Sequence, residues 1–413
     1  MPGLITERNF PTSWTIKRFK YCAQICNGGE YSDIEVEEGG YPVIGSGGEF
    51  ARASKFSYCG KSVLLGRKGT VDKPLFVDGA FWCVDTMFYT KIKDFMYEKY
   101  LYYCALCFPF DYYVTSTALP SMTQRDLGSQ EIAVPPKKDQ KAIADFLDKE
   151  CAQIDSIAAD LEKQIALLQQ YKKSLITEIV TKGLDKSVPM KDSGVEWLGK
   201  IPAHWNFKRL KFMLENSSDS MKVGPFGSAL SGSDFTDEGK WVYNQRVVLD
   251  NNFSENATFV SEEKFQEMRS FAVYPGDILI TTRGTIGKVA IVPEGANEGI
   301  LHPCIIKFRV DKEMIIPELL QLIFNESDFV KDQFTLMSNA TTIEVIYSYS
   351  LKDILLPVIP ADEQEKIYAY LSKKCIAIDG IIAEKQKALA TITQHKKSLI
   401  YEYVTGKKRV KEA

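Results

Sequence analysis

The sequence is poor in the residues that build metal sites and disulfide frameworks. It has three histidines, and its nine cysteines do not follow the spacing of a zinc site or of a set of disulfides. Cys104 and Cys107 lie in the apolar run YLYYCALCFPF without a second pair, so we interpret them as packed core thiols. The sequence therefore predicts no metal site and a reduced protein.

A signal peptide and an apolar run long enough to cross a membrane are also missing, so we expect a cytoplasmic protein. An excess of positive charge is missing as well. There are 51 Lys and Arg residues against 54 Asp and Glu residues, for a formal net charge of −3. This balance excludes a general polyanion binder coated in positive charge, but it allows a local basic cleft.

The motifs of common enzymes are absent too. There is no Asn/Asp-Pro-Pro-aromatic tetrapeptide and no glycine-rich loop for S-adenosylmethionine, and Gly284-x-x-Gly287-Lys288 lacks the spacing of a phosphate-binding loop. With three histidines, a Ser-His-Asp triad has little to draw on. We therefore expect no catalytic residues and no cofactor, which favours recognition over reaction.

A long segment occurs twice in the chain. Residues 134–181 align without a gap to residues 358–405, and about 22 of the 48 positions are identical. Both copies follow a heptad, with Leu147 and Leu371 among the d positions and Cys151 and Cys375 among the a positions. The pattern predicts two helices that pack on each other, each about 66 Å long for about 44 residues. The heptads alone do not decide between a parallel and an antiparallel pair.

The outer face of these helices also matches between the two copies. Packing between the helices cannot explain a match on the solvent side. Incomplete divergence after a duplication is one alternative, but we favour one kind of partner protein that docks on both copies. The matched residues at heptad position f are Lys149 and Lys373, Lys163 and Lys387, and Gln170 and Gln394.

A second motif divides the chain into two tandem halves. Pro11-x-x-Trp14 returns as Pro202-x-x-Trp205, and each copy opens a half that closes with one long helix. The segments between are rich in aromatics, glycine turns and short apolar runs, which predicts a mixed α+β fold. We predict a first domain at 1–136, a central helix at 137–183, a linker at 184–200, a second domain at 201–360, and a C-terminal helix and tail at 361–413.

Within the domains, the sequence predicts strands at 61–65 and 81–89 and helices at 93–108 and 317–324. A basic residue precedes Gly-Thr in a predicted turn of each domain, at Lys68 and at Arg283. A positive side chain, backbone N–H groups and a hydroxyl together suit a phosphate or the edge of a guanine. An ordinary turn is the alternative for either copy alone, and recurrence favours a DNA contact. The candidate DNA-binding residues are Arg67, Lys68, Thr70, Lys73, Lys222, Ser228, Arg246, Arg283, Thr285 and Lys288.

With these motifs the whole chain resembles the specificity subunit of type I restriction-modification systems. The resemblance rests on Asp192-Ser-Gly-Val-Glu-Trp-Leu-Gly199 before Ile201-Pro-Ala-His-Trp205, on the segment GDILITTRGTIGK, and on Pro360-x-x-Glu363-Gln364 at the start of the second helix. The first helix starts instead with Lys138-Asp139-Gln140.

The resemblance implies two target-recognition domains, each of which reads one half of a bipartite double-stranded DNA target. It implies an antiparallel helix pair that sets the spacer between the half-sites. It also implies two methyltransferase subunits that bind S-adenosylmethionine, with two restriction subunits as candidates for further partners. The chain would then be the non-catalytic recognition subunit of an adenine-specific DNA methyltransferase and endonuclease complex.

Two other functions stay open on the sequence. One is a coiled-coil scaffold that binds only proteins, and the other is a self-sufficient DNA methyltransferase or nuclease. The missing catalytic motifs count against the enzyme. Salt-dependent DNA binding by the assembled complex would separate DNA recognition from a protein scaffold.

Overall fold

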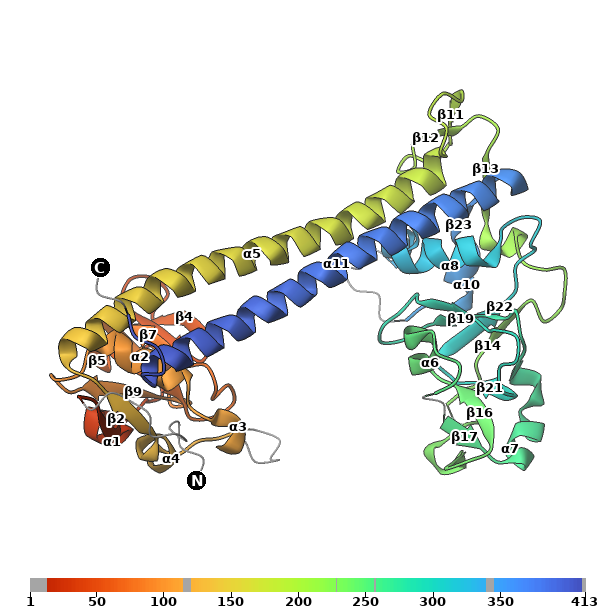
Figure 1. Cartoon of the computed structure of the whole chain (residues 1–413). Helices are drawn as coiled ribbons and strands as arrows, with labels where there is room; N and C mark the ends of the chain where they lie inside the picture. Colours follow the sequence, from red (N-terminus) through yellow and green to blue (C-terminus); the bar gives the residue numbers. More distant parts are fainter. Residues whose placement is uncertain (1–12, 114–119, 228, 256–257, 339–344, 411–413) are drawn as a thin grey trace. The chain divides into compact units, whose positions relative to one another are not determined.

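A computed structural model describes residues 13–113, 120–227, 229–255, 258–338 and 345–410. The chain divides into two compact units, one made of Met1–Lys163 with Lys385–Ala413 and one made of Gln164–Glu384. Two long helices, α5 (Lys137–Lys182) and α11 (Ala361–Val404), contribute to both units (Figure 1). Each unit therefore holds one mixed α+β domain and a part of both helices.

The two long helices pack through their heptad residues and run antiparallel. In the first unit, Leu147 near the start of α5 shares a core with Leu399 near the end of α11. In the second unit, Ile176 near the end of α5 shares a core with Leu371 near the start of α11. The prediction of two long packed helices is confirmed, and their direction is the one that the family resemblance implied.

The first domain consists of two four-stranded sheets and short helices (Figure 1). The sheets have the orders β2-β9-β6-β7 and β4-β3-β8-β5, and a separate pair joins β1 to β10. The strands are β1 (Thr15–Arg18), β2 (Ala23–Asn27), β3 (Tyr41–Gly45), β4 (Gly48–Ala53), β5 (Tyr58–Cys59), β6 (Ser62–Gly66), β7 (Leu75–Val77), β8 (Ala80–Cys83), β9 (Met87–Ile92) and β10 (Glu131–Val134). The helices are α1 (Phe19–Cys22), α2 (Glu98–Leu106), α3 (Phe110–Tyr113) and α4 (Gln124–Ser129), with a 3-10 turn η1 (Ser32–Ile34).

The second domain repeats this plan with a four-stranded and a five-stranded sheet. Their orders are β14-β22-β19-β20 and β15-β17-β16-β21-β18, and separate pairs join β13 to β23 and β11 to β12. The strands are β11 (Met190–Asp192), β12 (Lys200–Pro202), β13 (Asn206–Arg209), β14 (Met221–Val223), β15 (Phe235–Thr236), β16 (Lys240–Tyr243), β17 (Thr258–Val260), β18 (Ala272–Val273), β19 (Ile278–Thr281), β20 (Val289–Ile291), β21 (Gly299–Leu301), β22 (Ile305–Phe308) and β23 (Leu355–Val358). The helices are α6 (Gln245–Asp250), α7 (Glu262–Glu267), α8 (Pro317–Glu326), α9 (Phe329–Ser338) and α10 (Ser348–Asp353), with 3-10 turns η2 (Leu210–Phe212), η3 (Gly232–Asp234) and η4 (Arg269–Phe271).

The repeated tryptophan motif closes each domain onto its long helix. The strand after Trp14, β1, pairs antiparallel with β10 directly before α5. The strand after Trp205, β13, pairs in the same way with β23 directly before α11. Both tryptophans are buried in the core of their own unit, while Pro11 lies outside the described residues. The motif thus marks the point where each domain returns to its helix.

A buried glutamine ties each domain to the helix that follows it. Gln140 donates from Nε2 to the carbonyl oxygens of Pro135 and Phe95, at 2.9 and 3.1 Å, and accepts from the backbone N–H of Tyr97 at 2.7 Å. Gln364 occupies the same position of the other copy. Its partners are the carbonyl oxygens of Ile359 and Met314 and the N–H of Ile316. The helix starts differ in sequence, but both keep the residue that makes this anchor.

Several local predictions can be compared with the structure. The helix predicted at 317–324 is confirmed as α8, and the one predicted at 93–108 is the shorter α2. The single strand predicted at 81–89 is wrong, because a turn at Asp85 and Thr86 separates β8 from β9. The segment predicted as a linker, 184–200, contains β11, which forms a small hairpin with β12.

Candidate nucleic-acid interface

The turn that carries Arg283 projects from one end of β19 and is held on both sides. The backbone N–H and the hydroxyl of Thr282 donate to the carbonyl oxygen of Cys304, at 3.0 and 2.9 Å. The N–H of Ile346 donates to the carbonyl of Thr282 at 2.9 Å. Gly284 follows with a φ of +65°, a conformation that favours glycine. Arg283 and Thr285 are exposed on this anchored turn.

The turn that carries Lys68 has the same anchoring in the first domain. Gly69 has a φ of +77°, and the N–H of Met122 donates to the carbonyl of Arg67 at 3.0 Å. Lys68 forms an isolated bridge with Ser121. In the second domain, Gly284 has the left-handed conformation of Gly69, and the bond from Ile346 to Thr282 matches the bond from Met122 to Arg67. The bridge between Arg283 and Val345 matches the bridge between Lys68 and Ser121. The two turns therefore correspond in the folded domains as well as in the sequence.

The start of α6 lies beside the Arg283 turn. The side-chain amide of Gln245 donates to the carbonyl of Thr285 at 3.2 Å. Asn244 caps the helix, and its Oδ1 accepts from the backbone N–H groups of Arg246 and Val247 at 2.9 and 3.2 Å. The Arg246 side chain is 73% exposed, with Asp250 at 3.5 Å. The structure thus brings Arg246 to the same edge as Arg283 and Thr285.

Other predicted DNA-binding residues have partners inside their own domain. Lys288 donates from Nζ to the carbonyl of Asn325 at 2.7 Å. The Lys222 ammonium lies 5.1 Å from the centroid of the Phe271 ring. Arg67 donates to the carbonyl of Asp85 at 3.2 Å. Lys68 and Lys73 are exposed, Thr70 is half-buried, and Ser228 lies outside the described residues.

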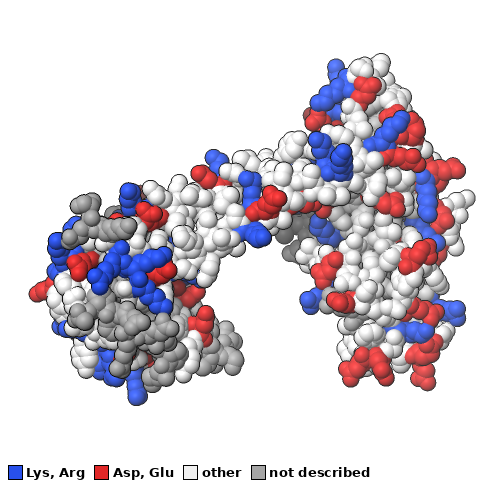
Figure 2. Space-filling view, viewed as in Figure 1, with Lys and Arg blue, Asp and Glu red and all other residues white. Residues whose placement is uncertain are grey.

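Charge is mixed on the face drawn in Figure 2. Lys and Arg side chains alternate with Asp and Glu side chains on both units, and acidic side chains gather at the tip of the second unit over β17 and α7. Helix α7 begins with Glu262 and Glu263. Attraction for a polyanion must therefore come from local groups such as the two basic turns.

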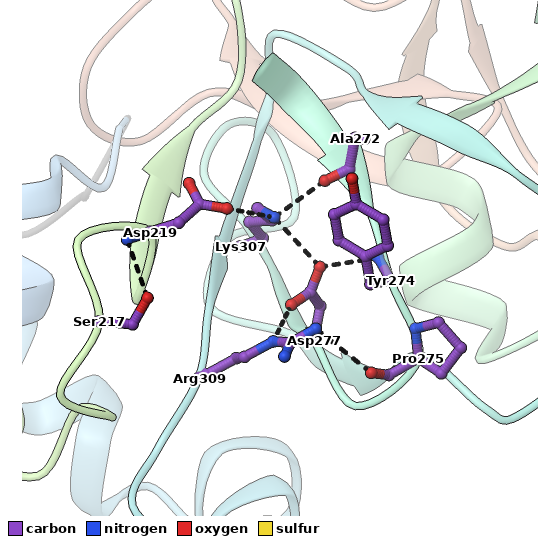
Figure 3. Close-up of polar contacts among 8 residues, drawn as sticks. All are labelled: Ser217, Asp219, Ala272, Tyr274, Pro275, Asp277, Lys307 and Arg309. Atoms are coloured by element: carbon purple, nitrogen blue, oxygen red, sulfur yellow. Dashed lines mark hydrogen bonds and ion pairs between the residues drawn. The ribbon is translucent and has the colours of Figure 1, made fainter. Parts of the chain in front are cut away.

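A buried ion network stabilises the sheet from which the Arg283 turn projects (Figure 3). Asp277, at the start of β19, is 1% exposed and accepts from Nε of Arg309 at 2.5 Å and from Nζ of Lys307 at 3.3 Å. Lys307 also donates to Asp219 at 3.1 Å and to the carbonyl of Ala272 in β18 at 2.8 Å. Hydrogen bonding to Asp277 raises the pKa of Arg309. Because Ala272 belongs to the other sheet, the network joins the two sheets of this domain.

The sequence prediction did not include this network. Its members lie far apart along the chain, and the only local signal was a charged residue, Lys307, inside the apolar run Ile305–Phe308. In the first domain the strand registers place Ser62 and Tyr89 where the second has Asp277 and Lys307. The equivalent positions of the first domain therefore carry no charges, and the ion network belongs to the second domain.

Two of the cysteines are protonated thiols, and the described residues contain no cluster that could hold a metal ion. Burial raises the pKa of Cys83 and of Cys107 to about 12, so both thiols stay protonated at neutral pH. No group of three or more His, Cys, Asp or Glu among these residues could hold a metal ion. A cavity of about 430 Å³ is lined by Lys173, Lys288 and Lys331, of which Lys173 bonds Asp328 and Lys288 bonds the carbonyl of Asn325. In the described part of the chain no helix has the length and apolar character needed to cross a membrane.

The predicted partner-binding residues of the long helices are all exposed. They are Lys149, Lys163, Gln170, Lys373, Lys387 and Gln394. The heptad positions therefore place them on the solvent side, as the sequence predicted. The contact with a partner stays a prediction.

Comparison with known proteins relates this geometry to one family. The type I restriction modification DNA specificity domain matches residues 11–167 and 222–391. The chain is 25% identical over 300 residues to the type I restriction enzyme MjaVIII specificity subunit of Methanocaldococcus jannaschii, which covers 71% of this chain and 66% of that subunit. It is 23% identical over 351 residues to the EcoBI specificity subunit of Escherichia coli, which covers 80% and 72%.

A solved structure has the same fold. It comes from work on complex assembly and conformational transition of the type I restriction-modification system, and it matches with a TM-score of 0.68 at 14% identity. The match covers 97% of this chain and 100% of that one. Each matched segment covers most of one of the two domains and most of the long helix that follows it. The chain therefore belongs to the type I restriction-modification specificity subunits and carries two of their DNA specificity domains.

Proposed function

We propose that the chain reads a bipartite DNA target, with one half-site for each domain. The observation that carries this proposal is the correspondence of the two basic turns. Each follows the corresponding strand, β6 or β19. Each is bonded to the residue two positions before the last short helix of its domain, and each has glycine at the left-handed position. Two copies of one surface suit two separate pieces of the same kind of ligand.

Arg283 and Lys68 would contact DNA from these turns. The fork of Arg283 can pair with O6 and N7 of guanine, while Lys68 offers a point charge that suits a phosphate or a single base acceptor. Arg246 and Thr285, at the same edge as Arg283, would add phosphate or sugar contacts. The acidic tip over α7 is unsuited to a polyanion, which favours the edge with the turns as the DNA side of the second domain.

The helix pair would set the spacer and dock the catalytic partners. Each domain is anchored to one long helix through Gln140 or Gln364, which supports a role of the helices in spacing the two domains. The exposed matched residues at heptad position f would bind two copies of one partner. The family suggests methyltransferase subunits that bind S-adenosylmethionine for adenine methylation, with restriction subunits as further partners. The chain itself would be non-catalytic.

A domain exchange tests the proposal. Residues 201–359 are replaced by the equivalent segment of a relative with a different target, and the complete system is expressed with its methyltransferase partner. Sequencing that detects methylated bases then gives the target of the hybrid. We expect one half-site to change while the other half-site stays. A change in both half-sites would show that the domains do not read independently.

The matched control replaces the first domain, residues 13–135, in the same way and should change the other half-site. The purified chain without its partners is assayed with labelled S-adenosylmethionine in parallel. Methyl transfer by the chain alone would contradict a non-catalytic subunit. If the complex methylated DNA regardless of the base sequence at both half-sites, neither domain would read DNA, and the chain would serve only as a protein scaffold.

A further inference from the structure

A loop beside the Arg283 turn presents an exposed phenyl ring. Phe226 follows β14 and is 88% exposed, more than any other large hydrophobic side chain among the described residues. The base of the loop is fixed, because the N–H of Gly224 donates to the carbonyl of Ile305 at 2.8 Å. A side chain at position 224 would collide with the backbone of His302. The ring is therefore held out from an anchored loop at the cost of exposing apolar surface.

One short segment connects this loop to the basic turn. Residues 302–305 connect the end of β21 to the first residue of β22. The carbonyl of Ile305 accepts from the N–H of Gly224, and the carbonyl of Cys304 accepts from the N–H of Thr282. The N–H of His302 donates in turn to the carbonyl of Tyr243, at the end of β16 and two residues before Gln245. Phe226, Arg283 and the start of α6 thus lie at one sheet edge, on backbone that is cross-linked by hydrogen bonds.

The strand registers identify the same loop in the first domain. The N–H of Gly28 donates to the carbonyl of Met87 at 3.1 Å, at the start of β9, as Gly224 does to Ile305 at the start of β22. A side chain at position 28 would collide with the backbone of Val84, as one at position 224 would with that of His302. Two residues beyond these glycines stand Glu30 in the first domain and Phe226 in the second.

Glu30 stands at the position that corresponds to Phe226 and has the opposite chemistry. Its Oε1 accepts from the hydroxyl of Ser32 at 2.9 Å and from the N–H groups of Tyr31 and Ser32 at 3.0 and 3.4 Å. The hydrogen bonds from Ser32 and Tyr31 lower the pKa of Glu30, so the carboxylate is ionised at neutral pH. A carboxylate on a DNA-facing loop is repelled by phosphates, and its favourable partner in the major groove is the amino group of cytosine. A phenyl ring suits instead the methyl group of thymine.

We propose that Glu30 and Phe226 are equivalent base-reading residues, with Glu30 selecting a cytosine in one half-site and Phe226 a thymine in the other. The proposal rests on the bipartite DNA recognition argued above and deepens it. It assigns the loop after β2 and the loop after β14 to specificity, next to the basic turns. The scaffold of the loop is the same in both domains, and only the exposed side chain differs.

The test uses the complete complex of this chain with its methyltransferase subunits. Phe226→Ala should relax selection at one A·T pair of the half-site read by the second domain and leave the other half-site unchanged. DNA with uracil in place of that thymine lacks the methyl group. The wild-type complex should methylate this uracil DNA at least about fivefold more slowly than the thymine DNA, which corresponds to the low end of the cost of a mismatched base pair. The variant should methylate both DNAs at the same rate.

Glu30→Gln gives the reciprocal result for the first domain. The amide oxygen still accepts from Ser32 and Tyr31, so the loop keeps its bonds while the charge is lost. Selection of one C·G pair should relax in that half-site only. Phe212→Ala is the matched control, because Phe212 is 63% exposed in the same domain as Phe226 but lies in η2. It should leave the target unchanged, and thermal unfolding should be unaltered in all three variants.

Three results would overturn the inference. The first is a half-site of the second domain that contains no A·T pair. The second is a Phe226→Ala complex with the wild-type target and the wild-type sensitivity to uracil. The third is a uniform loss of methylation by Phe226→Ala on all sequences, which would make the ring a backbone contact. None of them affects the proposed function, because the domain exchange would still move one half-site. If the domain exchange instead changes both half-sites or neither, the proposed function is wrong, and the assignment of Glu30 and Phe226 is wrong with it.

Discussion

Lys172 of α5 donates to both carboxylate oxygens of Asp379 in α11, each at 2.8 Å. The residues at the same positions of the helix repeat, Lys396 of α11 and Asp155 of α5, form the same pair. Nζ of Lys396 donates to the two carboxylate oxygens of Asp155 at 2.6 and 2.7 Å. Both lysines occupy an a position of the heptad, where the other residues are apolar. A charged residue at such a position lowers stability but fixes register and direction. We infer that the two ion pairs fix the antiparallel register of the helices.

The two pairs should differ in strength. Lys172 is buried and also bonds Glu326 at 2.7 Å, whereas Lys396 is more exposed. Burial acts to lower the pKa of Lys172, but the bonds to Asp379 and Glu326 outweigh it, so the pKa is raised and the ammonium stays charged. Lys172→Glu should therefore lower the free energy of unfolding by about 2 kcal/mol, and Lys396→Glu by about 0.5–1 kcal/mol. Urea denaturation measures both, and equal losses would contradict the ranking.

Charge reversal of the partner provides the control for this register. Adding Asp379→Lys to Lys172→Glu should recover part of the lost stability, because the ion pair re-forms with its charges exchanged. Glu326 then repels the new carboxylate at 172, so recovery stays incomplete. A double variant that is less stable than Lys172→Glu alone would show that Lys172 and Asp379 do not act as a pair.

The buried network around Asp277 should determine the stability of the second domain. Asp277→Asn removes the charge that compensates Lys307, whose side chain is 3% exposed, and should cost about 3–5 kcal/mol. The double change Asp277→Leu with Lys307→Met should cost less, because no uncompensated charge stays buried. Asp219→Asn is the matched control, since that side chain is 50% exposed. Thermal unfolding of the full chain orders the three variants, and an equal cost for the single and double changes would contradict the argument.

The long helices and the basic turns could be predicted because their signals are local or repeated. The heptad is a property of neighbouring residues, and Lys68 and Arg283 stand before the same Gly-Thr pair. The lysines at the a positions were visible in the same heptad. Their pairing is not visible there, because Lys172 interrupts an apolar pattern and its partner lies on the other helix, far along the chain.

The remaining features depend on contacts that no local pattern contains. Gln140 and Gln364 are identical residues of the repeat, but their role as anchors needs the carbonyl groups of another part of the domain. Asp277 and Lys307 are ordinary charges until the sheets pack. The sequence does not show that Glu30 and Phe226 correspond, because the number of residues between them differs from the number that separates the two copies of the long helix. Only the pairing of β2 with β9 and of β14 with β22 brings them into register.

Arg283 should contribute to one half-site and Lys68 to the other. Arg283→Ala in the assembled complex should cost about 1–3 kcal/mol and relax selection at one base if the guanidinium grips a base edge. A uniform loss with a shallower salt slope would mean a phosphate contact instead. Binding of a panel of half-site variants at two salt concentrations separates these outcomes. Lys68→Ala, tested on the same panel, should leave the half-site of Arg283 unchanged, and unaltered DNA binding by a stable Arg283→Ala complex would remove this turn from the interface.

The last prediction treats the helix pair as a ruler. The ion pairs of Lys172 with Asp379 and of Asp155 with Lys396 place Ala158 of α5 opposite Thr393 of α11. Four residues inserted after each of these positions lengthen both helices by about 6 Å and restore most of their facing. On DNA this is close to two base pairs at about 3.4 Å each. The half-site bases should therefore stay the same while the preferred spacer grows by one or two pairs, as read from the methylated sites of cells that carry the system.

The same insertion placed after Asp185, in the exposed segment between α5 and β11, is the matched control. It adds chain without lengthening the helix pair, so the spacer should not change. The insertion in the helices introduces a local stutter in the heptad, and some loss of stability is expected. Denaturation is therefore measured for both variants. The anchors at Gln140 and Gln364 move with the helix ends, so longer helices must change the spacer if the helix pair sets it. If a folded variant with longer helices kept its original spacer, the helices would serve only to dock partners.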